Sequence, residues 1–241
     1  MVCNTGVSWT PIVEDKRYTF KHGGNYNGLF LMRDRETASL WHHITGDCVD
    51  GELEGAQLKG PQHLHYLTAA EALKRFPQAQ FPLGDSIAWW QRLIANIMRR
   101  TMWTNSGGMI PPFFRPSMEK RDERLPELEV GIGVWQDDKA RFYRLKTLTE
   151  NGGAVIDTPG TDRLVIFVDP YSNAPIAICT DAETCEWEGN TLILDNGTKI
   201  EHGSLKSSDG TESKLSYPRQ VFTRWYGFSY TYPDCDIFTL D

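Results

Sequence analysis

Long hydrophobic runs are missing from this sequence of 241 residues. No stretch of about 18 apolar residues occurs, which excludes a predicted membrane-spanning helix. The first residues also lack the basic segment followed by an apolar stretch that marks a secretory signal peptide. We therefore expect a soluble, cytoplasmic protein.

Basic charge is scarce. The chain has 25 basic residues against 32 acidic ones, which gives a net charge of -7, and no long run of Lys and Arg offsets this excess. A negative field repels phosphate backbones, so nucleic acid is not an expected partner. The sequence does not indicate an oligomeric state.

Cysteine is neither abundant nor patterned. The five cysteines are an odd number and show no CxxC spacing, so neither a disulfide framework nor a zinc ribbon is expected. Cys179, Cys185 and Cys235 lie in strand-like or apolar segments, and we interpret them as buried small hydrophobic residues. Other templates are absent too: there is no GxSxG elbow, no HExxH, no Gly-rich phosphate loop and no dinucleotide-binding fingerprint.

The composition is that of a folded globular chain, with 40% hydrophobic and 24% charged residues. Short β-like runs lie on either side of a helical middle segment, over residues 7–13, 17–21, 29–33, 130–135, 140–143, 163–168, 175–179 and 191–194. Thr68, with Glu71 three positions later, predicts a capped helix over 69–76. The aromatic segment 220–238 is expected to close a core against the sheets.

Residues 86–103 form the longest helical pattern, which is amphipathic and rich in Trp and Arg. We expect its apolar face to pack on the β core, as most such faces do. The alternative is that a basic, Trp-bearing helix lies on an anionic membrane surface. On the first interpretation a membrane surface is not an expected partner.

Internal duplication is predicted from two matches in the same order. Residues 31–37 (LMRDRET) resemble 192–198 (LILDNGT), and residues 76–81 (FPQAQF) resemble 232–237 (YPDCDI). A connector rich in Gly, Pro and charge over 105–125 separates a first β repeat with C-terminal helices, 1–104, from a second β repeat with an aromatic-rich tail, 126–241. The predicted fold is mainly β with a few helices (α+β), built as internally duplicated meanders or barrel-like halves packed together.

Three motifs of the first half resemble a widespread prokaryotic family that is known only as a domain of unknown function. They are the cysteine-containing opening CNTG at 3–6, the D-x-x-T-x-S-x-W stretch from Asp34 to Trp41, and the glycines Gly46 and Gly51 that follow. The second half is similar to the family as well, notably in TRWYGF at 223–228. The resemblance covers nearly the whole chain and implies no established reaction.

Thiol and imidazole side chains of the first half are candidate metal ligands. The preferred set is Cys3, His43 and His65, with Cys48, His42 and His63 as further candidates. Thiolate and imidazole are ligands that copper and zinc accept, and His63-Leu64-His65, if extended, puts both imidazoles on one face of a strand. Copper or zinc is therefore the expected cofactor.

Two carboxylates, Asp34 and Glu36, are the candidate proton-transfer groups. On a strand they face the same way, and two adjacent carboxylates raise the pKa of one of them. The simpler interpretation is that Asp34, like Asp195, forms a turn at a strand end, and that the charged residues around it are a solvated edge.

Two functions stay open from the sequence. The preferred one is a metal-dependent enzyme, an oxidoreductase that acts on a small molecule. The alternative is a non-catalytic β module that binds a small ligand or a protein partner through the aromatic tail and the region of Trp41.

Overall fold

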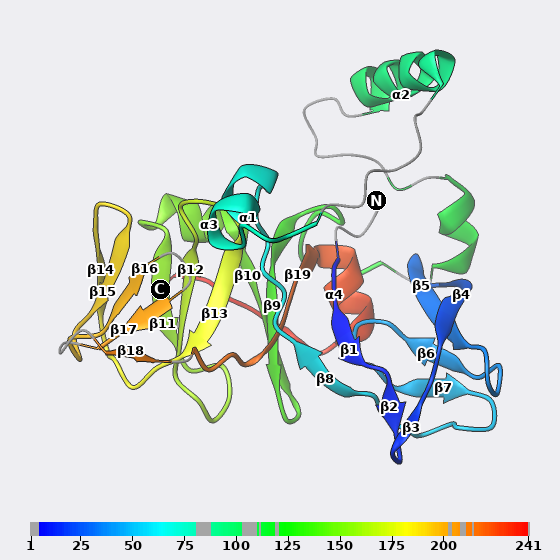
Figure 1. The fold of residues 1–241 in the computed structure, drawn as a ribbon, viewed down its shortest axis with the longest axis horizontal. Coiled ribbons are helices and arrows are strands. Elements are labelled where there is room, and N and C mark those ends of the chain that lie inside the picture. Colours follow the sequence, from blue (N-terminus) through cyan, green and yellow to red (C-terminus); the bar gives the residue numbers. More distant parts are fainter. Residues whose placement is uncertain are drawn as a thin grey trace.

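The computed structural model describes residues 5–80, 88–102, 110, 112–118, 121–201, 204–207, 211–213 and 215–240. The chain is mainly β, as predicted, and several sheets succeed one another along the molecule (Figure 1). None of the helices in the described part of the chain has the length and apolar content needed to cross a bilayer.

The first half is built on a four-stranded antiparallel meander. Its strands are β4 (Phe20–Tyr26), β5 (Leu29–Asp34), β6 (Leu40–His42) and β7 (Cys48–Asp50), in that order across the sheet. The hairpin of β2 (Ile12–Val13) and β3 (Lys16–Arg17) and the antiparallel pair of β1 (Ser8–Thr10) and β8 (Lys59–Gln62) complete this half. Trp41, Cys48 and Leu58 form a small core beneath the meander.

The second half contains three sheets, none of which closes into a barrel among the described strands. The first has the order β19 (Arg219–Arg224), β9 (Val130–Gln136), β10 (Lys139–Arg144), β20 (Asp236–Ile237). The second consists of β11 (Ala154–Asp157), β12 (Leu164–Val168) and β13 (Pro175–Cys179). The third is the meander of β14 (Cys185–Glu188), β15 (Thr191–Leu194), β16 (Lys199–Glu201), β17 (Ser204–Lys206) and β18 (Glu212–Ser213).

Strand β12 shows why these sheets stack. Its sequence is a continuous apolar run, and side chains alternate between the two faces of a strand. Leu164 and Ile166 enter a core with β9, β10 and α3 (Leu145–Glu150), whereas Val165 and Phe167 enter a second core with the β14–β18 meander. A strand that is buried on both faces does not need to alternate polar and apolar residues. This explains why β12 is apolar throughout.

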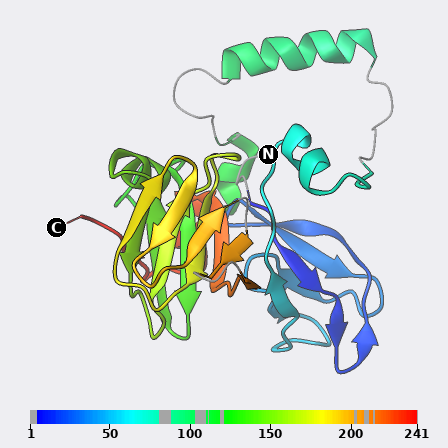
Figure 2. The same cartoon turned by 60° about the vertical axis from the view of Figure 1, so that its left-hand side comes forward.

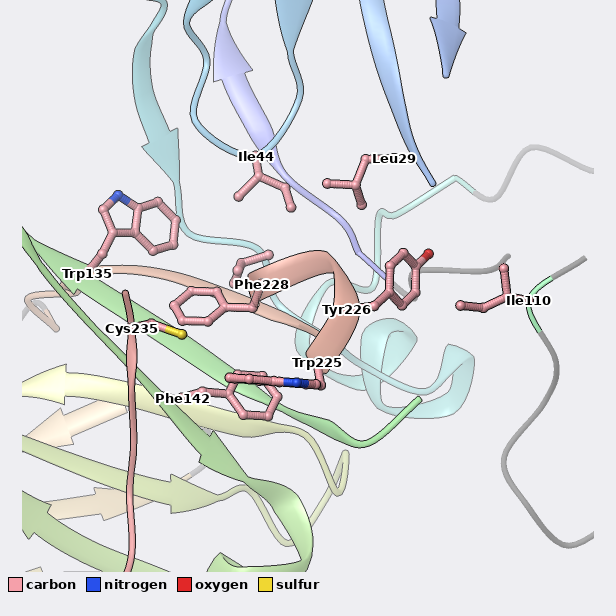
Figure 3. Packing of buried hydrophobic residues seen from close by; sticks show 10 residues of the cluster. Leu29, Ile44, Ile110, Trp135, Phe142, Trp225, Tyr226, Phe228 and Cys235 are labelled. Carbon is pink, nitrogen blue, oxygen red and sulfur yellow. The ribbon is translucent and has the colours of Figure 1, made fainter. Parts of the chain in front are cut away.

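Helix α4 (Trp225–Thr231) joins the two halves (Figure 3). Its Trp225, Tyr226 and Phe228 are buried against β9 and β10 on one side and against Leu29 and Ile44 of the first half on the other. The expectation that the aromatic tail closes a core is confirmed, because one hydrophobic cluster contains residues of both halves.

Helix α1 (Ala69–Arg75) begins as predicted, because the Thr68 hydroxyl accepts a hydrogen bond from the Glu71 N–H at 3.2 Å. Its end resembles that of α4. The C-cap residues Phe76 (φ −128°, ψ 76°) and Tyr232 (φ −130°, ψ 79°) have nearly the same backbone conformation, and a proline follows each. This local likeness supports the predicted duplication.

The other repeat match is less alike in detail. β5 and β15 both lie inside antiparallel meanders, but the Asp at the end of each strand has different partners. Asp34 accepts from the turn that follows it, whereas Asp195 accepts from the N–H groups of Glu183 and Thr184 before β14. Duplication therefore stays a prediction, and so does the division at 105–125, of which η1 (Pro112–Ser117) is part.

Helix α2 (Trp89–Met102) contradicts the sequence expectation. Both ribbon views show it standing apart from the sheets (Figures 1 and 2). Trp89 is 77% exposed, and Trp90, Leu93 and Ile94 are each about half exposed. The prediction that this apolar face packs on the β core is wrong for Trp90 and Ile94; Ile87 and the side chains of Ile97 and Met98 lie outside the described part of the structure. Amphipathicity indicates that a helix has an apolar face, but it does not indicate what covers that face.

Candidate functional site

Asp34, a candidate proton-transfer group, is completely buried at the end of β5. Its carboxylate accepts hydrogen bonds from the Thr37 N–H (2.6 Å), the Thr37 hydroxyl (2.9 Å), the Ala38 N–H (3.1 Å) and the Trp41 Nε1–H (2.9 Å). Burial alone raises the pKa of Asp34, but these hydrogen bonds outweigh it and hold the pKa below its ordinary value. The turn-forming interpretation describes Asp34 well.

Glu36 does not share a strand face with Asp34, because β5 ends at Asp34 and Glu36 lies in the turn. Its carboxylate accepts from the Thr19 N–H at 2.9 Å and from the Arg35 N–H at 3.1 Å. These bonds, that from Thr19 first, lower the pKa of Glu36. The prediction that the pKa of one of these carboxylates is raised is therefore wrong, because the pKa values of Asp34 and Glu36 are both lowered.

His43, a candidate metal ligand, is buried in a stack of rings. Its imidazole stacks on Phe30 with ring centres 4.5 Å apart, and the His42 ring lies 5.7 Å away. Burial, and then the neighbouring His42, lower the pKa of His43 to about 4, so the ring is neutral at pH 7.

Cys48 lies in a different environment from both His43 and His65. It is buried with Trp41 and Leu58, its thiol donates to the Asp50 carbonyl at 3.6 Å, and burial raises its pKa. The structure does not bring Cys48, His43 and His65 together: across the described ranges, no three His, Cys, Asp or Glu side chains gather closely enough to hold an ion. Cys3 lies outside the described residues.

The structure does bring His63 and His65 together, as the alternation along an extended segment predicts. Their ring centres are 4.9 Å apart and the rings are perpendicular. Burial, and then the charge of His65, lower the pKa of His63 to about 4, and burial followed by Arg75 lowers the pKa of His65. Both rings are neutral at pH 7. The positive charge of Arg75 is offset by an ion pair with Glu71 at 3.1 Å.

Tyr217 of the second half completes this group. Its ring is stacked parallel to that of His63, with 3.7 Å between ring centres, and so covers one face of the imidazole. The Nε2 atom of His63 is buried and makes no hydrogen bond to any described residue. A buried polar atom without a partner costs free energy, and such an atom marks a place where a ligand can supply the missing interaction.

A cavity of about 90 Å³ lies beside His63, in the seam between the two halves. The first half contributes Gly6, Val7 and residues 60–64 and 66, and the Tyr66 hydroxyl donates to the Gly6 carbonyl at 3.0 Å. The second half contributes the segment from Tyr217 to Gln220, together with Phe222 of β19, Pro175 of β13 and Ile132 of β9. We call this space the seam cavity. Neither Asp34 nor Glu36 is among the described residues that line it.

Part of the alternative site predicted from the sequence is buried, whereas Phe222 of the aromatic tail lines the seam cavity. Trp41 is fully buried, and so are Trp225 and Phe228 of the aromatic tail. Tyr217 and Arg219, which line the seam cavity, carry no signal in the sequence that connects them to His63, because their partner lies in the other half of the chain.

Comparison with known proteins gives one finding. A family model described as "Protein of unknown function (DUF3179)" matches residues 1–235. No curated protein and no solved structure gives a significant match. The matched range includes both meanders, helix α4 and the seam cavity.

Proposed function

We propose, from the premise that the chain belongs to the DUF3179 family of proteins of unknown function, that it is a metal-dependent enzyme with a copper or zinc ion on His63 and His65. The resemblance noted in the sequence is thus confirmed, and the family supplies no reaction. The observation that carries the proposal is the imidazole pair, in which the buried Nε2 of His63 has no partner among the described residues.

The spacing of the two rings fits one shared ion. A zinc–nitrogen bond is about 2.0–2.1 Å long, and the ring centre lies about 1.2 Å behind the nitrogen, so two imidazoles on a tetrahedral ion have centres about 5 Å apart. The observed separation of 4.9 Å matches this value. Both rings are neutral at pH 7, the form in which imidazole binds a metal.

Cys3 is the proposed third ligand. Gly6 lines the seam cavity and is held by Tyr66, and three residues of extended chain span at most about 11 Å. The chain length between Gly6 and Cys3, which lies outside the described residues, therefore allows the proposed ligation. His43 and Cys48, the other candidates from the sequence, lie in separate environments, and we assign them packing roles.

The seam cavity defines the size of the substrate. Sites for drug-sized ligands and organic cofactors have volumes of about 300–1,000 Å³. A cavity of about 90 Å³ admits only a molecule of a few heavy atoms. Two imidazoles and one thiolate leave a coordination position open toward it, where copper supports electron transfer and zinc supports Lewis-acid chemistry. We prefer copper and an oxidoreduction.

The test is metal analysis of the full chain purified without a metal-affinity tag. We expect one copper or zinc ion per chain, either as isolated or after incubation with each metal. His63→Ala and His65→Ala are expected to lose the ion. His22→Ala is the matched control, because His22 is exposed and its ring stacks on Phe30, away from the imidazole pair. Circular dichroism verifies that each variant is folded.

Copper loading also tests the third ligand. A cysteine thiolate on copper(II) gives an intense visible absorption, which Cys3→Ser is expected to remove while the two histidines still retain weaker binding. The proposal is overturned if the chain stays empty after incubation with both metals, or if His63→Ala holds as much metal as the unaltered chain. In that case the seam cavity is a binding pocket of a non-catalytic module.

A further inference from the structure

Helix α2 stands apart from the sheets in both ribbon views (Figures 1 and 2). Residues 89–94 and 96 are all exposed, which covers every side of its first two turns. Exposed Trp, Leu and Ile side chains at this density are costly in water, since each fully buried side chain of this kind gains about 1.5–3 kcal/mol. We therefore expect a binding partner to cover the apolar stripe of Trp89, Trp90, Leu93 and Ile94.

The charge of α2 indicates what kind of partner covers this stripe. Its sequence contains three arginines, Arg92, Arg99 and Arg100, and no acidic residue. The chain as a whole has 32 acidic and 25 basic residues, so without these three arginines the acidic excess rises from 7 to 10. Positive charge is concentrated on the helix and negative charge on the remainder of the chain.

We propose that α2 is an interfacial helix that docks the protein on an anionic lipid surface. Trp and Leu enter the boundary between headgroups and acyl chains, and the arginines contact lipid phosphates and carboxylates. The 14-residue helix is about 21 Å long, too short to cross a hydrocarbon layer of about 30 Å, so it lies in the plane of the surface.

The acidic remainder of the protein sets the orientation. An anionic surface repels it, so α2 makes the contact and the sheets stay in water. A second copy of the chain is the competing occupant, because its acidic surface attracts arginine as well. An apolar stripe needs an apolar counterpart, however, and two copies of α2 facing one another bring like charges together.

The experiment is sedimentation of the full chain with vesicles of neutral phosphatidylcholine, with and without about 30% anionic phosphatidylglycerol. Each basic residue near such a surface contributes about fivefold, so three arginines predict about 100-fold tighter binding to the anionic vesicles. About 0.5 M salt is expected to remove most of this difference, because it shortens the screening length to a few ångströms.

Two variants separate the contributions. Trp89→Ser/Leu93→Ser is expected to weaken binding to anionic vesicles at least about tenfold. Arg92→Glu replaces a positive charge with a negative one and is expected to weaken binding to the same vesicles. The matched control is Ile12→Ser/Val49→Ser, which removes two exposed apolar side chains from strands and is expected to bind like the unaltered chain. Circular dichroism of each protein verifies its helix content.

Three results overturn the proposal. They are no sedimentation with anionic vesicles, equal binding to neutral and anionic vesicles, and equal binding by the unaltered chain and Trp89→Ser/Leu93→Ser. Light scattering distinguishes the rival occupant: a dimer that Trp89→Ser/Leu93→Ser dissociates assigns the stripe to a second copy of the chain.

Discussion

The Asp34 carboxylate is buried and charged, and it accepts from three donors of the turn that follows it and from the Trp41 Nε1–H of β6. Asp34→Ala leaves the buried Trp41 Nε1–H without an acceptor and opens the turn. We expect a loss of about 3 kcal/mol in the free energy of unfolding, since hydrogen bonds to charged groups contribute about 1.5–3 kcal/mol. Urea denaturation measures the loss.

Asp34→Asn refines this prediction. The amide keeps one acceptor oxygen and turns a second acceptor into a donor that faces other donors, so we expect an intermediate loss of about 1–2 kcal/mol. Asp195→Asn is the control, because Asp195 directly follows a meander strand but is exposed. Equal losses for the two Asn variants would contradict a special role for the buried turn.

His43 makes stability depend on pH. Its pKa is about 4 in the folded protein and about 6.5 in the unfolded chain. The unfolded chain therefore binds more protons between these values, and the free energy of unfolding falls as the pH decreases from about 6.5 to about 4, by about 3 kcal/mol in total.

The variant His43→Phe tests this dependence. Phe keeps a ring against Phe30 and removes the titrating group. Denaturation midpoints at about pH 7.5, 6 and 5 are expected to fall less steeply for the variant than for the unaltered chain. A remaining slope is expected from His63, whose pKa is lowered in the same way. Identical slopes would show that His43 does not titrate as described.

The sequence predicts part of the candidate site. His63-Leu64-His65 gives the imidazole pair by strand alternation, and the D-x-x-T stretch gives the Asp34 turn. It does not predict the stacking of Tyr217 on His63, because that contact joins the two halves of the chain. It also places Glu36 wrongly on one strand face with Asp34, because β5 ends at Asp34, two residues before Glu36.

At the scale of elements, the approach of α4 to β9 depends on Gly133. A Cβ placed there lies 2.0 Å from a ring atom of Phe228, well inside contact distance. Gly133→Ala therefore forces the helix away from the strand, and we expect a loss of about 3 kcal/mol, the upper range for overpacked cores. Thermal or urea unfolding checks the size of the effect.

A double-mutant cycle identifies the cause of that loss. In a Phe228→Leu background the ring that clashes is absent, so Gly133→Ala is expected to cost less than it does in the unaltered chain. If the two losses add, the clash with Phe228 is not the reason, and the glycine acts through strand pairing instead.

Elements with local signals are predicted well. The Thr68 cap starts α1, and the apolar run of β12 marks a strand buried on both faces. Helix α2 is also predicted as a helix. Its separation from the sheets is not, because local periodicity gives the apolar face and tertiary packing decides its neighbour.

At the scale of the whole molecule, the shared cluster around α4 couples the two halves. Ile44 of the first half is fully buried against residues of the second half. We expect the halves to unfold in one transition, and Ile44→Ala to lower the free energy of unfolding by about 3 kcal/mol. Hydrogen exchange read separately in β5 and β12 is expected to show the same decrease; a decrease confined to β5 would mean that the halves unfold independently.

Because α4 comes so late in the chain, order of synthesis matters for this protein. Leu29 and Ile44 leave the ribosome long before Trp225 and Phe228 exist to cover them. The nascent first half must wait with an uncovered apolar surface until residues 225–228 have been synthesised, and during that interval it is exposed to aggregation.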